Sequence, residues 1–256
     1  MDAATIVKRI RATDGLSRAD LARLADVSAS TVGRIESGKL DPTWSTLQKM
    51  LEATGMVLAG KTVVSAGDAT AVSSARAILE GKLDAASPRW RRSWARAGWT
   101  TAAMTPESVL GLAVLAGNAA KFSRRSRQPL YVELPDQRQW QDLPRALAAA
   151  GVDYAISGLV ATTPDRATAP ASSPIIYVTN PRRVVEQLGL VETAPLRGTM
   201  LVSPVAGEME GVETEGGLRF VSRVQAMLDA FASGGRQPEK AEAVALTWPA
   251  REDVPA

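Results

Sequence analysis

Apolar residues along the first sixty positions repeat every three or four residues, and polar caps and glycines interrupt them at short intervals. This spacing is typical of short amphipathic helices that bury one face. Ser17 and Ser28 suit helix N-caps, and Gly15, Gly38 and Gly55 suit the breaks between helices. The pattern predicts helices at about 5–13, 18–25 and 29–37, and a fourth that opens at Asp41-Pro42 and stops at Gly55.

Only three residues, Asp26-Val27-Ser28, separate the second predicted helix from the third. Asp26 tolerates irregular backbone in the turn, Val27 can fill the corner, and Ser28 caps the next helix. Two short helices joined in this way predict a helix-turn-helix, which presents its second helix to a DNA major groove.

Residues 15–38, GLSRADLARLADVSASTVGRIESG, together with Pro42 and Thr46-Leu47, resemble the Cro/C1-type (XRE) family of regulators. The resemblance covers about residues 4–55 and implies an all-α DNA-binding bundle whose third helix is the recognition helix. Three positions depart from the family pattern, namely Arg18, Asp26 and Gly33. A glycine inside a helix costs about 1 kcal/mol relative to alanine. We therefore expect Gly33 to serve a close approach to DNA or to a neighbouring helix.

The resemblance implies which side chains meet DNA. Arg34 is the expected bidentate reader of a guanine edge, and Arg18 and Lys39 are placed to clamp phosphates. The small residues at the start of the helix favour a close fit to the groove and contacts with thymine methyl groups. The predicted base-edge and phosphate candidates on this helix are Ser28, Ala29, Ser30, Thr31 and Arg34. The alternative is a protein-interaction bundle with solvated arginines.

The middle of the chain is basic. Residues 76–127 contain ten basic and three acidic side chains, whereas residues 128–256 contain eleven basic and sixteen acidic ones. Trp90 and Trp94 lie four apart on a predicted helix and are expected as core anchors. The cluster Arg124, Arg125 and Arg127 is a candidate auxiliary phosphate-contact patch. Elements expected here are a strand or hairpin at 55–64, a small polar linker at 65–70, and helices at about 70–81, 88–99 and 105–121.

The second half alternates short apolar runs with helical patterns, which is typical of an α/β or α+β domain with a mixed sheet. Strands are expected at 129–134, 153–157, 174–179, 199–203 and 218–221, and helices at about 140–150, 181–188, 222–232 and 238–247. Glu208, Glu210, Glu213 and Glu215 are interpreted as a solvated hairpin, with a cation site as the alternative.

Scattered positions in residues 128–248 resemble AbiEi-type antitoxins of type IV toxin–antitoxin pairs. They include Tyr154-Ala-Ile-Ser-Gly158, the Ile-Ile-Tyr-Val strand and Gly235-Arg236. That family commonly carries a winged helix-turn-helix in front, where this chain has a Cro/C1-type pattern. The resemblance implies autoregulatory DNA binding and neutralisation of a nucleotidyltransferase-like toxin, without catalysis by this chain.

Composition narrows the chemistry further. The chain of 256 residues has no cysteine and no histidine, which removes thiolate and imidazole metal sites, the Ser-His-Asp triad and the commonest general base. No phosphate loop, dinucleotide fingerprint or paired metal-binding aspartates occur in it. We therefore expect no enzyme activity, cofactor or metal. An enzyme using Asp153 or Asp165 is the least favoured alternative.

The sequence as a whole predicts a multidomain chain. Its expected parts are a helix-turn-helix domain with a trailing strand (1–64), a linker with a basic helical segment (65–127) and an α/β domain (128–256). No signal segment or membrane-spanning run is recognised, so we expect a cytoplasmic protein. The predicted function is a bacterial autorepressing antitoxin that binds operator DNA. Specific affinity is expected to need either a dimer on an inverted repeat or a second DNA-contacting surface, which the basic residues 76–127 could provide. The alternative is a ligand-sensing repressor with a pocket lined by Tyr131, Trp140, Tyr154 and Tyr177.

Overall fold

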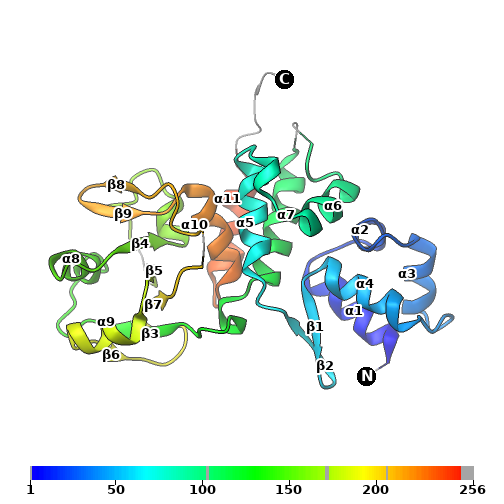
Figure 1. The fold of residues 1–256 in the computed structure, drawn as a ribbon, viewed down its shortest axis with the longest axis horizontal. Coiled ribbons are helices and arrows are strands. Elements are labelled where there is room, and N and C mark those ends of the chain that lie inside the picture. Colours follow the sequence, from blue (N-terminus) through cyan, green and yellow to red (C-terminus); the bar gives the residue numbers. More distant parts are fainter. Residues whose placement is uncertain (1, 102–103, 171–172, 206, 249–256) are drawn as a thin grey trace.

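The computed structural model describes residues 2–101, 104–170, 173–205 and 207–248. A small helical bundle lies at one end of the molecule, a layer of helices occupies the middle, and a mixed sheet forms the other end (Figure 1). No helix in the described residues is long and apolar enough to cross a membrane.

The N-terminal bundle begins with four helices and ends with a hairpin. Its elements are α1 (Ala3–Thr13), α2 (Arg18–Ala25), α3 (Ala29–Glu36), α4 (Trp44–Ala53), β1 (Met56–Ala59) and β2 (Thr62–Ser65). Val7, Leu21, Ile35 and Met50, one from each helix, are fully buried at its centre. Each lies on the apolar face that the sequence predicts for its helix. The fourth helix begins at Trp44 and not at Asp41-Pro42, because the Thr43 side chain accepts a hydrogen bond from Thr46 N at 3.2 Å and caps the helix there.

Helices from two distant parts of the chain form the middle layer. The basic segment supplies α5 (Ala69–Leu79), α6 (Pro88–Ala97) and α7 (Pro106–Ala119), and the end of the chain supplies α10 (Arg223–Ala232) and α11 (Gln237–Leu246). Helix α7 packs against α5, α10 and α11 (Figure 1). Gly117 permits the close approach, since a Cβ there would lie 2.4 Å from Phe231 Cβ. The sequence predicts that residues 65–127 and residues 128–256 are separate parts of the chain. In the structure, helices from both segments pack together in this layer.

The sheet is mixed, as the sequence predicts. Its seven strands follow the order β6-β3-β7-β5-β4-β9-β8, with β5–β7 and β4–β9 parallel and the other pairs antiparallel. The three central strands, β4, β5 and β7, are buried along their whole length. The strands are β3 (Leu130–Glu133), β4 (Tyr154–Ser157), β5 (Ile175–Val178), β6 (Val191–Glu192), β7 (Thr199–Val202), β8 (Glu213–Glu215) and β9 (Leu218–Phe220).

Shorter elements complete the α/β region and its junctions. Helices α8 (Asp142–Ala149) and α9 (Pro181–Leu188) connect strands, and η1 (Leu83–Ala85), η2 (Phe122–Arg124) and η3 (Leu159–Thr162) are 3-10 turns. Strand β6 was not anticipated from the sequence. It has only two residues, both exposed, so it carries no alternation of apolar and polar positions.

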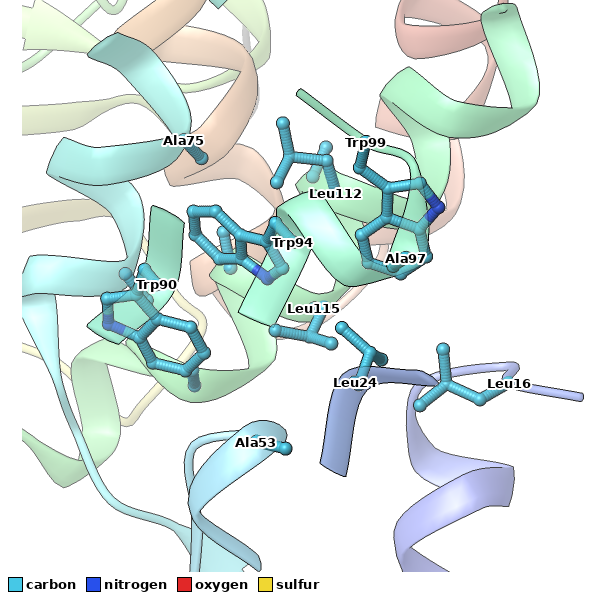
Figure 2. Close-up of a cluster of buried hydrophobic side chains, with 14 of the residues drawn as sticks. Leu16, Leu24, Ala53, Ala75, Trp90, Trp94, Ala97, Trp99, Leu112 and Leu115 are labelled. Carbon is cyan, nitrogen blue, oxygen red and sulfur yellow. The ribbon is translucent and has the colours of Figure 1, made fainter. Parts of the chain in front are cut away.

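Two tryptophans of α6 join the bundle to the helical layer. Trp90 and Trp94 are fully buried and stacked, with ring centroids 4.9 Å apart, which confirms them as core anchors. Figure 2 shows the two indoles among Leu24 and Ala53 of the bundle and side chains of the helical layer. The same hydrophobic core therefore continues from the bundle into the layer.

Polar contacts hold the same junction. The Ser93 hydroxyl donates to the Leu24 carbonyl at 3.0 Å, and the Arg96 guanidinium donates to the carbonyls of Arg23 and Leu24 at 3.1 and 2.9 Å. These acceptors belong to the last turn of α2, where helix carbonyls lack partners within the helix. Ser93 and Arg96 of α6 thus provide hydrogen-bond donors for the carbonyl groups at the C-terminal end of α2.

The segment predicted as a linker, 65–70, is fastened to the end of α7. Ser65 Oγ and the Asp68 amide both donate to the Ala119 carbonyl, at 2.9 and 2.8 Å. A Cβ on Gly55 would lie 2.3 Å from Ala119 Cβ, so the hairpin also packs closely there. These contacts fix the bundle to the helical layer.

A buried carboxyl lies at this junction. Asn118 Nδ2 donates to the Thr13 carbonyl at 3.0 Å and to Asp14 Oδ1 at 2.9 Å. Burial raises the pKa of Asp14 to about 7, against the opposing hydrogen bond from Asn118 and the charge of Lys121. Burial also lowers the pKa of Lys121, which the charge of Asp14 partly offsets.

Candidate DNA-binding site

The turn before α3 has the geometry that a helix-turn-helix requires. Asp26 adopts a left-handed conformation (φ 57°, ψ 52°) at the end of α2, which an aspartate tolerates better than most residues. Ser28 Oγ then accepts a hydrogen bond from the Thr31 amide at 2.9 Å and lies 2.8 Å from Thr31 Oγ1. The hydroxyls of Ser28 and Thr31 are thus engaged in starting the helix.

Helix α3 buries one face and exposes the other. Val32, Ile35 and Glu36 point into the bundle. The structure brings together on the outer face the residues that the sequence assigned to DNA. Ser28, Ala29, Ser30, Arg34 and, just beyond the helix, Lys39 are exposed, and Thr31 is half-buried. Within the described residues the Arg34 guanidinium makes neither a hydrogen bond nor an ion pair.

Glu36 organises the arginine beside this face. Its carboxylate is 1% exposed and accepts from Arg18 Nε at 2.6 Å and from Arg11 Nε at 2.9 Å. Burial alone would raise the pKa of Glu36, but the bonds and charges of Arg11 and Arg18 outweigh it and lower that pKa. The carboxylate therefore stays ionised and holds both guanidinium groups.

The Arg18 side chain reaches outward from this ion pair. It is 58% exposed, and in the described part of the chain its two terminal nitrogens have no hydrogen-bond partner. Such an arginine presents a fixed fork that matches phosphate geometry. Sequence reasoning overlooked Arg11 and Glu36. The available signal was an acid directly after Ile35, on the apolar side of the helix.

Gly33 has space around it. A Cβ at this position would meet only Arg18 Cδ, at 3.9 Å, which is an ordinary van der Waals contact. Close packing by a neighbouring helix is therefore not the reason for the glycine. The other predicted reason, close approach to DNA, stays a prediction.

The predicted arginine patch of residues 124–127 is divided by the fold. Arg124 and Arg127 are exposed, but Arg125 is 5% exposed. Its guanidinium forms a double hydrogen bond to the Glu208 carboxylate, at 3.0 and 2.6 Å, and lies over the Phe122 ring. The prediction that Arg125 contacts phosphate is wrong, because this guanidinium is already paired in the interior.

The solvated-hairpin interpretation of the four glutamates is confirmed for Glu213 and Glu215, which lie on β8 of the β8–β9 hairpin, and is wrong for Glu208. Glu208 is buried with Arg125. Glu213 and Glu215 pair with the buried Arg166 at 2.5 and 2.9 Å, and the exposed Glu210 pairs with Arg76 at 3.3 Å. No cluster able to hold a metal ion occurs among the residues that the structure describes.

A hydrogen-bonded network centred on Asp229 lies inside the α/β region. Ser157 Oγ and the Tyr177 hydroxyl donate to Asp229 Oδ2 at 2.5 and 2.9 Å, and Gln225 Nε2 donates to Oδ1 at 2.8 Å. Burial and the charge of Glu208 raise the pKa of Asp229 to about 7. All four residues are fully buried, so the network joins α10 to the sheet.

The four aromatic residues considered for a ligand pocket separate into two pairs. Tyr154 and Tyr177 are core residues, 1% and 0% exposed. Tyr131 and Trp140 instead line surface cavities on the α/β region. Asp153, one of the two residues of the enzyme alternative, pairs with Arg219.

Comparison with known proteins supports the N-terminal assignment. Residues 4–63 match the family profile described as "Helix-turn-helix domain", which covers the bundle from α1 to β2. This part of the chain is a helix-turn-helix domain, and such domains suggest DNA binding. Neither a search of curated proteins nor a search of solved structures finds a significant match. The resemblance of residues 128–248 to AbiEi-type antitoxins therefore rests on the sequence alone.

Proposed function

We propose that this protein is a sequence-specific DNA-binding transcriptional regulator that inserts α3 into the major groove. The observation that carries the proposal is the Arg18 guanidinium, held by the buried Glu36 next to an exposed face of small residues and Arg34. Arg34 would read a base edge, and Arg18 and Lys39 would position the helix on phosphates.

One recognition helix covers only a few base pairs. Specific binding at physiological salt therefore calls for two copies on an inverted repeat. The exposed Arg127 would add a phosphate contact, whereas Arg125 is excluded by its burial and Arg124 lines a cavity on the side of the α/β region.

Footprinting of the full chain on the DNA upstream of its own gene tests the proposal. A protected inverted repeat that survives physiological salt is the expected result for an autoregulator. The matched variants are Arg34→Ala, on the recognition face, and Arg182→Ala, an exposed arginine on α9. The first should weaken the footprint and the second should leave it intact. Equal footprints for both variants would contradict the assignment of α3.

The finer proposal is an autorepressing antitoxin that neutralises a nucleotidyltransferase-like toxin. It is supported by the resemblance of residues 128–248. The test is growth rescue, with the full chain co-expressed with a toxin candidate encoded next to its gene. Truncation before residue 128 is unsuitable, because it removes α10 and α11 from their packing on α7. Arg34→Ala should retain rescue while losing operator binding, and no rescue by the unmodified chain would refute the antitoxin role.

A ligand-sensing repressor is the second candidate function. The observation that favours it is that Tyr131 lines two adjoining cavities, one of which also borders the helix-turn-helix domain.

A further inference from the structure

A cleft of about 700 Å³ lies where the helix-turn-helix domain meets the α/β region. The bundle contributes Arg9 and Thr13 of α1 together with residues 63–65 of β2, and the turn after α7 contributes residues 121–124. The α/β region contributes Tyr131, Leu196 and the turn between α10 and α11. A second cavity of about 380 Å³ shares Tyr131, Leu196 and residues 233–235 and continues to Arg236 and Lys240.

The charges that line this double cleft all have one sign. Arg9, Lys121 and Arg124 line the larger part, and Arg236 and Lys240 line the smaller part. None of the described residues that line either part is an aspartate or a glutamate. A concave site bordered by cations alone concentrates anions from solution.

Several of these cations are unsatisfied by the protein itself. Within the described residues, Arg9, Arg124 and Lys240 form no ion pair, whereas Arg236 pairs with Glu239 at 3.8 Å. Lys121 Nζ donates to the carbonyls of Phe231 and Ser233 at 2.8 and 3.2 Å. Those bonds hold the ammonium group at the cleft, close enough to the buried Asp14 for the charge of that carboxyl to act on its pKa.

The remainder of the lining is apolar and includes a strained residue. The lining includes Tyr131, which is half-buried, and Met56 and Val63, which are only 4% and 6% exposed. Leu196 is 52% exposed and has a φ of +69°, a conformation that is unusual for a leucine. Residues held in such conformations cluster at ligand sites.

We propose that this cleft binds a small organic anion, with a phosphate or carboxylate head against the cations and an aromatic or aliphatic body against Tyr131 and Leu196. The volume is typical of sites for small molecules. The cleft is an unsuitable path for operator DNA, because α3 lies at the far end of the bundle from the α/β region (Figure 1).

This inference deepens the ligand-sensing function, and its regulatory part rests on DNA binding by α3. The ligand would touch both α1 and the α/β region, so its binding would add to the contacts that already hold these two parts together. Ligand binding itself requires no DNA. The binding claim and the regulatory claim can therefore be tested, and refuted, independently of each other.

The test uses three probes that share one ring system, namely 1-naphthyl phosphate, 1-naphthoate and the neutral 1-naphthalenemethanol. Each is titrated into the full chain by calorimetry without DNA. We expect saturable binding, one molecule per chain, for at least one of the two anions and none for the alcohol. The anion that binds identifies the head group. Equal binding of the alcohol, or no saturable binding of either anion at millimolar concentration, would overturn the proposal.

Matched charge variants locate the site. Arg9→Gln and Arg124→Gln remove exposed cations that line the cleft, and Lys8→Gln removes the exposed cation next to Arg9 that does not line it. Because hydrogen bonds to charged groups are strong, each cleft variant should weaken anion binding about tenfold, with no change for Lys8→Gln. An equal loss in all three variants would indicate general surface attraction and refute the site. Repeating the operator footprint with the bound anion then tests the regulatory part alone.

Discussion

Two buried glutamates in this protein each hold arginine, one in the bundle and one in the α/β region, and they do so with different results. Glu36 and Glu208 are both 1% exposed at the side chain. Glu36 holds Arg11 and also Arg18, which is 58% exposed, whereas the partner of Glu208 is Arg125, which is 5% exposed. The first pair orients a cation toward solvent, and the second closes an interior contact.

This difference shows that pairing with a buried glutamate does not by itself tell whether an arginine is a structural residue or a candidate DNA contact. At Glu36 the carboxylate binds only Nε of Arg18 and leaves the terminal nitrogens free for a phosphate. At Glu208 the carboxylate takes both terminal nitrogens of Arg125. The number of guanidinium donors left over separates a candidate DNA contact from a structural one.

The largest expected effect is at the closed pair. Arg125→Ala leaves the Glu208 charge buried and unpaired, which costs about 3–5 kcal/mol of the free energy of unfolding. Urea denaturation measures it, with Arg124→Ala, an exposed neighbour, as the control within about 0.5 kcal/mol of the unmodified chain. Unchanged stability with a reduced salt slope of DNA binding would instead make Arg125 a phosphate contact.

Asp14 sharpens the comparison, because it is a buried carboxyl without an arginine. Its pKa in the folded protein, about 7, lies above its ordinary value of 3.8, so the folded state binds the proton more tightly. The contribution of Asp14 to stability is therefore complete below about pH 4 and is lost as the pH rises through about 7. Asp14→Asn should remove this part of the pH dependence, on the order of 2–4 kcal/mol. Urea denaturation at pH 5.5 and at pH 8.0 provides the measurement. If the difference in unfolding free energy between the two pH values is the same in Asp14→Asn as in the unmodified chain, burial does not raise the pKa of Asp14.

Glu36→Gln tests the open pair. Removing the charge weakens both arginine contacts, and we expect a loss of about 2–3 kcal/mol of unfolding free energy, since hydrogen bonds to charged groups contribute about 1.5–3 kcal/mol each. Operator affinity should also fall, because Arg18 is no longer held. Glu186→Gln, an exposed acid on α9, is the control. A stable variant with intact affinity would mean that Glu36 does not position Arg18.

Arg34→Ala separates base reading from stability. The side chain is exposed, so the unfolding free energy should be unchanged. Binding to the operator should weaken by about 1–3 kcal/mol, and discrimination at one base pair should relax. Competition with operators that carry single base changes measures it. Retained discrimination at every position would place the recognition contacts elsewhere.

The smallest expected effect is at Gly33. Gly33→Ala adds a Cβ that meets only ordinary contact with Arg18, so the helix should gain about 0.5–1 kcal/mol of stability. If the glycine serves close approach to DNA, the same variant should bind the operator more weakly. Greater stability with unchanged binding would leave the glycine without a role in recognition.

The sequence predicted the local structure well, because local chemistry determines it. The caps at Ser17 and Ser28 and the apolar spacing identify the bundle helices to within a few residues. The mixed sheet was also predicted correctly. The exposed face of α3 follows from the same periodicity, with Val32 and Ile35 inside and Arg34 outside.

Contacts between distant segments were not predictable in this way. Arg125 lies in a run of basic residues that is typical of a surface, and its partner Glu208 follows 83 positions later. The packing of α7 on α10 and α11 joins segments more than a hundred residues apart. Single-sequence patterns contain no information about such pairings, so neither the burial of Arg125 nor the packing across the predicted boundary at residue 128 could be predicted.

The fastening of residues 65–68 to Ala119 has a geometric consequence for a pair of chains on DNA. Because residues 65–68 do not act as a flexible linker, the bundle keeps one orientation relative to the rest of its chain. The distance between the two recognition helices of a dimer would then be set by how the two chains contact each other. Such a dimer would accept only one spacing between the two half-sites, with both half-sites on the same face of the duplex. Adding five base pairs, about half a turn of the duplex, between the half-sites should then turn one of them to the wrong face.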